Sequence, residues 1–144
     1  MQVKEVMCDR VTAAPLGTSV QDAFEIMREG GFRHLPVLDT RGQVAGILSD
    51  RDLRSVGAIY KDPATGTEEF LVTEDTTVDK IMIPEPFTVS PDDPVAKAIQ
   101  LIREKRIGCL IVTESDRLVG ILSYLDLLGL LSKYVENSPA ESAA

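Results

Sequence analysis

The sequence contains one pattern written twice: the segment from Val3 to about Val56 returns as the segment from Val78 to about Leu131. Both copies run through the same tetrapeptide, Gly46-Ile47-Leu48-Ser49 in the first and Gly120-Ile121-Leu122-Ser123 in the second. Self-similarity at a fixed spacing indicates a fold built from copies of one supersecondary unit. The match also aligns Val11-Thr12 with Phe87-Thr88.

Each copy carries one amphipathic helix near its start. Apolar residues recur at the i, i+3, i+4, i+7 spacing of a buried helix face, at Val20, Ala23, Phe24 and Met27 and again at Val95, Ala98, Ile99 and Ile102. Ser19 and Asp22 resemble an N-terminal capping pair, and Asp93 precedes Pro94 at the favoured first helical position. We expect the two helices to end at Gly30-Gly31 and at Ile107-Gly108.

Two β-hairpins follow the predicted helices. The β-prone runs 34–38 and 109–113 each lead through a polar turn into a second run, 44–48 and 118–122. A closing helix comes next, so each copy is predicted to be a β-α-β-β-α unit. One unit this small would leave its sheet exposed. The predicted fold class is therefore α+β, with tandem repeats packed sheet to sheet about a pseudo-two-fold axis.

This pattern divides the chain into four segments. We expect a first repeat at 1–60, a linker at 61–77, a second repeat at 78–135 and a disordered tail at 136–144, with the two repeats forming one folding unit. The stretch 57–77 has loop character, because the turn-rich segment 62–66 lies within it. Its apolar triplet Phe70-Leu71-Val72 fits a short strand, a patch on the module or a contact with another chain.

Composition and charge narrow the classes of function. The net charge of −8 disfavours nucleic acid and anionic lipid as partners. No apolar stretch approaches the roughly 20 residues that cross a bilayer, and the first ten residues lack the pattern of an export signal, so we expect a cytoplasmic protein that binds no membrane. Cys8 and Cys109 form no CxxC pair and lie near no His, which predicts inert thiols and no metal site.

The duplicated unit resembles the CBS (cystathionine-beta-synthase) domain, and the chain resembles a stand-alone pair of such domains. The resemblance rests on Gly31-Phe32-Arg33-His34-Leu35-Pro36 in the first repeat and on Gly-Ile-Leu-Ser-x-x-Asp in both. It covers nearly the whole chain apart from the linker and tail. It implies a regulatory module that binds AMP, ADP, ATP or S-adenosylmethionine between its repeats, forms a homodimer and controls an unidentified protein. It implies no catalytic cofactor.

The shared motif supplies the first candidate ligand contacts. The resemblance implies that Ser49 with Asp52, and Ser123 with Asp126, bind the ribose and lie near the phosphate. The chemistry fits, because a carboxylate accepts hydrogen bonds from both ribose hydroxyls and a helix N-terminus offers free N–H groups. The same spacing is typical of a helix N-cap with an acid that complements the helix dipole, and capping and binding are compatible.

Further ligand residues are implied on either side of the hairpin strands. Arg33 and His34 are the phosphate candidates, although a solvated surface charge and a partly buried histidine are equally good interpretations. The resemblance also implies a ligand cleft between the repeats, and the segments that would cross it begin at Thr12 and Thr88. The remaining residues implied to contact the ligand are Leu35 and Pro36 in the first repeat and Ile107, Gly108 and Cys109 in the second.

The second repeat departs from the fuller pattern. Gly108 and Cys109 stand where the first repeat has Arg33 and His34, and Ile111 replaces Pro36. Lys105 and Arg106 could supply the missing positive charge or could simply be favourable charges at a helix C-terminus. The apolar residues that could sandwich an adenine ring, or only pack, are Val11, Leu35, Ile107 and Leu110.

Two other classes of function compete with ligand sensing. A structural module that dimerises or docks without a small-molecule ligand would use the leucines of the second closing helix, namely Leu127, Leu128, Leu130 and Leu131, for which core packing is the alternative. An enzyme is disfavoured, because a single histidine and the lack of a phosphate-binding GxxxxGK[ST] loop or metal cluster leave little to perform chemistry.

Overall fold

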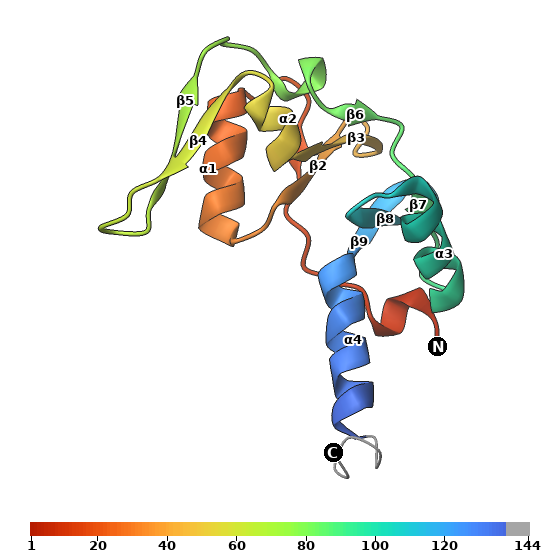
Figure 1. Cartoon of the computed structure of the whole chain (residues 1–144). Helices are drawn as coiled ribbons and strands as arrows, with labels where there is room; N and C mark the ends of the chain where they lie inside the picture. Colours follow the sequence, from red (N-terminus) through yellow and green to blue (C-terminus); the bar gives the residue numbers. More distant parts are fainter. Residues whose placement is uncertain (138–144) are drawn as a thin grey trace. The chain divides into compact units, whose positions relative to one another are not determined.

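The computed structural model describes residues 1–137, which form two compact units (Figure 1). One unit is the continuous segment Thr12–Pro86, and the other combines Met1–Val11 with the chain from Phe87 onwards. Each unit is a mixed α/β structure, as predicted from the duplication. The expected tail lies almost entirely outside the described residues.

The Thr12–Pro86 unit holds a four-stranded sheet in the order β1-β2-β3-β6 and a separate two-stranded sheet of β4 and β5. In chain order its elements are β1 (Ala14–Pro15), α1 (Val20–Gly30), β2 (His34–Leu38), β3 (Val44–Ser49), α2 (Asp50–Arg54), β4 (Gly57–Lys61), β5 (Glu68–Val72), the 3-10 turn η2 (Val78–Lys80) and β6 (Ile83–Pro84). Strands β2 and β3 form the predicted antiparallel hairpin, and β1 adds to it in parallel.

The other unit repeats this plan without the second hairpin. Its elements are η1 (Val3–Glu5), β7 (Thr88–Val89), α3 (Val95–Lys105), β8 (Cys109–Glu114), β9 (Arg117–Ser123) and α4 (Tyr124–Glu136). The sheet order is β7-β8-β9, and Cys8 adds an isolated bridge to Ile121. In the part of the chain that the structure describes, no helix is long and apolar enough to cross a membrane.

Helix α1 confirms the sequence prediction at both ends. The Ser19 hydroxyl accepts a hydrogen bond from the Asp22 N–H at 3.0 Å, and Gly31 takes the left-handed conformation that ends the helix. Helix α3 differs: Pro94 is the N-cap rather than the first helical residue, and the left-handed residue after the helix is Arg106 rather than a glycine. The predicted end at Ile107-Gly108 was therefore wrong.

The apolar helix faces enter the two hydrophobic cores. All four predicted residues of α1 are buried against β2, β3 and α2. In α3, Val95 and Ala98 are buried and Ile102 packs against the core, but Ile99 is exposed. The buried face of α3 is therefore narrower than that of α1, and narrower than predicted.

The predicted loop between the repeats is a β-hairpin instead. Strands β4 and β5 pair in antiparallel register from Gly57 opposite Val72 to Lys61 opposite Glu68, and the turn-rich segment 62–66 connects them. Figure 1 shows this hairpin beside α1. The contact is specific, because Phe70 is buried with its ring centroid 5.3 Å from that of Phe24.

The leading segments of the two sequence repeats are exchanged between the compact units. A Cβ on Gly46 would lie 2.5 Å from Met82 Sδ and 2.8 Å from the Ile83 carbonyl oxygen, and a Cβ on Gly120 would lie 2.5 Å from Met7 Sδ. The methionine near the start of each sequence repeat thus packs on the glycine of the other repeat's tetrapeptide. Only glycine leaves room for this approach.

Replacing Gly46 with alanine should destabilise the protein by about 1–3 kcal/mol, the usual cost of overpacking. The Ile83 carbonyl belongs to the backbone and cannot rotate away. Gly129→Ala in α4 is the matched control, because nothing lies within 4 Å of its Cβ position, and it should be neutral or stabilising by up to about 1 kcal/mol. Urea unfolding curves compare the two variants, and equal stabilities would contradict the close approach at Gly46.

Candidate functional site

The first candidate carboxylate lies where β3 passes into α2. Asp52 Oδ2 accepts hydrogen bonds from the Ser49 backbone N–H at 2.8 Å and from the Ser49 hydroxyl at 3.1 Å. Both side chains are half-buried. The strand therefore ends in a cap that holds the Asp52 carboxylate in a fixed orientation.

The second repeat builds the same cap at the junction of β9 and α4. Asp126 Oδ2 accepts from the Ser123 N–H at 2.8 Å and from the Ser123 hydroxyl at 3.0 Å, and the Ser123 hydroxyl oxygen accepts from the Asp126 N–H at 3.2 Å. Within residues 1–137, the hydrogen bonds that end on either carboxylate end on Oδ2. The Oδ1 atoms of Asp52 and Asp126 keep their lone pairs for another donor.

The Ser-x-x-Asp spacing by itself does not distinguish these two positions. It recurs at Ser19 to Asp22 and at Ser90 to Asp93, where the side chains also make cap or turn hydrogen bonds. The capping interpretation of Ser49 and Ser123 is confirmed. The ligand interpretation stays a prediction, and what sets these two caps apart is their place at the end of a sheet strand.

The register of each hairpin places a second candidate beside each cap. His34 lies opposite Ser49 across β2 and β3, and Cys109 lies opposite Ser123 across β8 and β9. Burial lowers the pKa of His34 below 6.5, against the opposing influence of Asp50 and Asp52. Burial also raises the pKa of the Cys109 thiol to about 12, with a further contribution from Asp126. Both groups are therefore neutral at pH 7.

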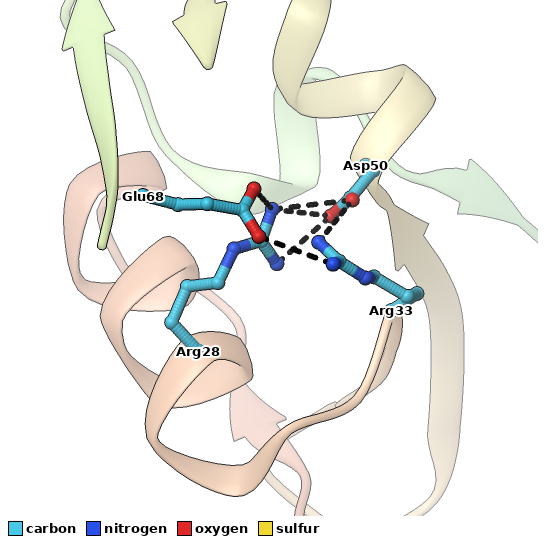
Figure 2. Close-up of polar contacts among 4 residues, drawn as sticks. All are labelled: Arg28, Arg33, Asp50 and Glu68. Carbon is cyan, nitrogen blue, oxygen red and sulfur yellow. Dashed lines mark hydrogen bonds and ion pairs between the residues drawn. The ribbon is translucent and has the colours of Figure 1, made fainter. Parts of the chain in front are cut away.

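Arg33 belongs to a cluster of four charged side chains drawn from α1, the residue before β2, α2 and β5 (Figure 2). Its guanidinium lies 2.9 Å from Asp50 Oδ2 and 3.1 Å from Glu68 Oε1. Arg28 reaches the same two carboxylates, at 3.1 Å and 3.3 Å. Sequence reasoning missed Arg28, Asp50 and Glu68, because no local pattern signals a cluster assembled from four separate elements.

The other predicted ligand residues occupy varied environments. Leu35 is fully buried in the first core, and Pro36 is buried beside it in β2. Ile107 and Gly108 are half-buried and precede β8, where Leu110 belongs to the second core. Thr12 and Thr88 are exposed. The burial of Leu35 and Leu110 supports the packing interpretation of these two residues.

Thr12 and Thr88 are not equivalent positions. Ala14 pairs with Val37 in one unit, and Val89 pairs with Val112 in the other. Because Val37 and Val112 are the same position of their hairpins, Ala14 is equivalent to Val89, and Thr88 is equivalent to Ala13. The sequence alignment of Val11-Thr12 with Phe87-Thr88 was therefore wrong by one residue.

The two basic residues near the second cap differ in their environment. The Lys105 ammonium lies over the Phe87 ring, 5.3 Å from its centroid, and Arg106 is the left-handed residue that ends α3.

A groove of about 380 Å³ between α1 and β5 is lined by Phe24, Arg28, Leu71 and four glutamates among others. It includes no residue predicted for the ligand, and its acidic lining is unsuited to a phosphate.

The fold and the duplicated caps define a CBS domain pair, and comparison with known proteins gives the same result. The family model for the CBS domain matches residues 3–58 and 77–133, so the chain belongs to the CBS domain family. A CBS domain-containing protein of Dictyostelium discoideum is 30% identical over 141 residues, which cover 97% of this chain and 97% of the relative.

Solved structures share the fold. The CBS domain pair of protein MJ0100, crystallised with 5′-methylthioadenosine and S-adenosyl-L-methionine, matches with a TM-score of 0.76 at 22% identity, covering 93% of this chain and 98% of the other. The protein CBSX2, crystallised with AMP, matches with a TM-score of 0.72 at 25% identity, covering 92% and 97%. The predicted family and fold class are confirmed.

The imidazole of His34 should titrate below pH 6.5, because burial disfavours its charged form. It is the only histidine of the chain, so its ring protons give one unambiguous NMR titration curve. With the folded pKa depressed, the unfolded chain takes up a proton first, and stability is lost as the pH falls from 6.5 through the folded pKa. The His34→Gln variant should lack this loss, and a measured pKa at or above 6.5 would contradict the burial.

Proposed function

We propose that the chain is a regulatory module that binds an adenosine-containing ligand at the two strand-end caps and passes the state of occupancy to a partner protein. The observation that carries the proposal is the matched pair of aspartates whose Oδ2 atoms are fixed by the caps while Oδ1 is left to accept. A ribose offers two vicinal hydroxyl donors to such a carboxylate.

The first repeat suits a ligand that carries a phosphate. Arg33 and His34 flank the cap of Ser49 and Asp52, and an adjacent phosphate dianion would raise the pKa of the imidazole and favour its charged form. Helix α2 is a single turn, so Arg33 and His34 supply the principal phosphate contacts. The AMP bound to CBSX2, a protein 25% identical to this chain, supports AMP as the first ligand to test.

The second repeat suits a ligand without a phosphate. Gly108 and Cys109 replace the two basic residues, the Cys109 thiol is neutral, and Lys105 lies over Phe87. This repeat lacks the arginine–histidine pair of the first, whereas the Asp126 carboxylate is compatible with the positive sulfonium of S-adenosylmethionine. The two sites therefore differ in the ligand charge that they favour. No catalytic cofactor enters this proposal.

The regulatory role requires that the ligand binds two arrangements of the module with different affinities. A shift between these arrangements would be read by a partner that contacts the module. We propose only the class of this partner: it is a protein whose activity depends on whether the ligand is bound.

Asp52→Asn should weaken AMP binding by roughly tenfold or more, because hydrogen bonds to a charged group contribute about 1.5–3 kcal/mol. The asparagine carbonyl still accepts from Ser49 and preserves the cap. Asp22→Asn is the matched control, since Asp22 has the same spacing from a capping serine at the start of α1. Isothermal titration of AMP into the variants measures the effect.

A flat wild-type titration with AMP, ATP and S-adenosylmethionine would contradict ligand binding. Equal loss of affinity in Asp52→Asn and Asp22→Asn would remove the special role of the strand-end cap.

A second candidate function is self-association through α4. No residue of this helix is buried, and it exposes Leu125, Leu128, Leu131, Tyr134 and Val135. Leu127 instead packs against the second core. An exposed apolar face of this kind is typical of an interface, and a homodimer is the simplest closed assembly.

Sedimentation velocity over a concentration series tests this association. The wild-type chain should form a reversible dimer, and Leu128→Gln with Leu131→Gln should shift it to monomer by removing apolar area from the interface. Leu16→Gln, an exposed leucine of the other unit, should leave the dimer intact. A wild-type chain that stays monomeric at every concentration would contradict the candidate.

A further inference from the structure

The β4–β5 hairpin distinguishes the first repeat from the second. Strand β5 lies between the two segments that match the CBS domain model, and the second repeat has no counterpart within the described residues. The first residue of β5, Glu68, forms an ion pair with Arg33, the phosphate candidate of the first site. The hairpin therefore has a direct charged contact with the proposed site.

The two arginines of the cluster hold the carboxylates in different ways. Arg28 is 17% exposed, and its guanidinium lies over the Phe24 ring at 4.7 Å from the centroid. Arg33 is 56% exposed. Packing fixes Arg28 in place, whereas the more exposed Arg33 contacts the same two carboxylates (Figure 2).

This arrangement lets Arg33 leave at low cost. If its guanidinium turns to another anion, Asp50 and Glu68 both keep their bonds to Arg28, so no buried charge is left unpaired. If Arg28 turned away instead, Asp50 and Glu68 would both lose their buried partner. Arg33 is thus the member of the cluster that can exchange partners, and the pair it makes with Glu68 is a weak, exposed one.

Resting on the proposed function, we propose that Glu68 competes with the ligand phosphate for Arg33. Glu68 is then a specificity-determining residue of the first site, which lowers affinity for phosphorylated adenosine ligands and not for adenosine. When a phosphate takes Arg33, Glu68 loses one of its two arginine partners, and the turn end of the hairpin, where Lys61 lies opposite Glu68, loosens. Phe70 stays buried, so the change is confined to that end.

The lowered pKa of Glu68, caused first by its hydrogen bond to Arg33, agrees with this competition. The raised pKa of Arg33 has the reciprocal cause. Each group stabilises the charged form of the other, and a phosphate must replace that interaction.

A double-mutant cycle tests the competition. Isothermal titration of AMP and of adenosine is measured for wild type, Glu68→Gln, Arg33→Gln and the double variant. Glu68→Gln should bind AMP roughly two- to fivefold more tightly, the range that an exposed ion pair allows, and should bind adenosine unchanged. The effect should vanish when Arg33 is absent. Glu69→Gln, which loses only a hydrogen bond from Tyr60, is the matched control.

Hydrogen exchange gives an independent readout. AMP should speed exchange of the backbone amides at the turn end of the hairpin, around Lys61 and Glu68, in wild type, and adenosine should not. If AMP binds but Glu68→Gln leaves its affinity unchanged, or alters AMP and adenosine equally, the competition is overturned while the proposed function stands. If wild type binds neither compound, the proposed function fails and the competition fails with it.

Discussion

The hydrogen bonds between the strand-end serine and the aspartate three residues later are the interaction on which this account depends. They lie where a sheet strand leads directly into a helix, and they fix a carboxylate at that junction with one oxygen engaged and the other free to accept. In the proposed function, stability and ligand recognition use the same residues, which is why motif spacing alone does not separate them.

The two halves of the chain share this device but differ around it. The first has Arg33 and His34 beside its cap and a hairpin that reaches Arg33 through Glu68. The second has a buried neutral thiol at the position of the imidazole. Duplication supplied two equal frames, and the changes in charge around each frame make the proposed sites unequal.

Local patterns explain what could be predicted from sequence. Helix α1 and both hairpins follow from periodicity and turn residues, which act within a few positions. The hairpin at 57–72 was missed because its buried residue, Phe70, finds its partner Phe24 far away in sequence. The ion pair between Arg28 and Glu68 was not predicted for the same reason. The exchange of leading segments is invisible in the sequence, because the repeats read identically whichever copy Met7 and Met82 pack against.

Backbone amide shifts in a two-dimensional NMR titration with AMP test the central claim most directly. The account predicts that the largest changes fall on residues 33–34 and 49–53 of the first repeat, where strand, cap and basic residues meet. Changes confined to the groove between α1 and β5, with the amides of Ser49 and Asp52 unshifted at saturation, would show that the cap carboxylate does not bind the ligand.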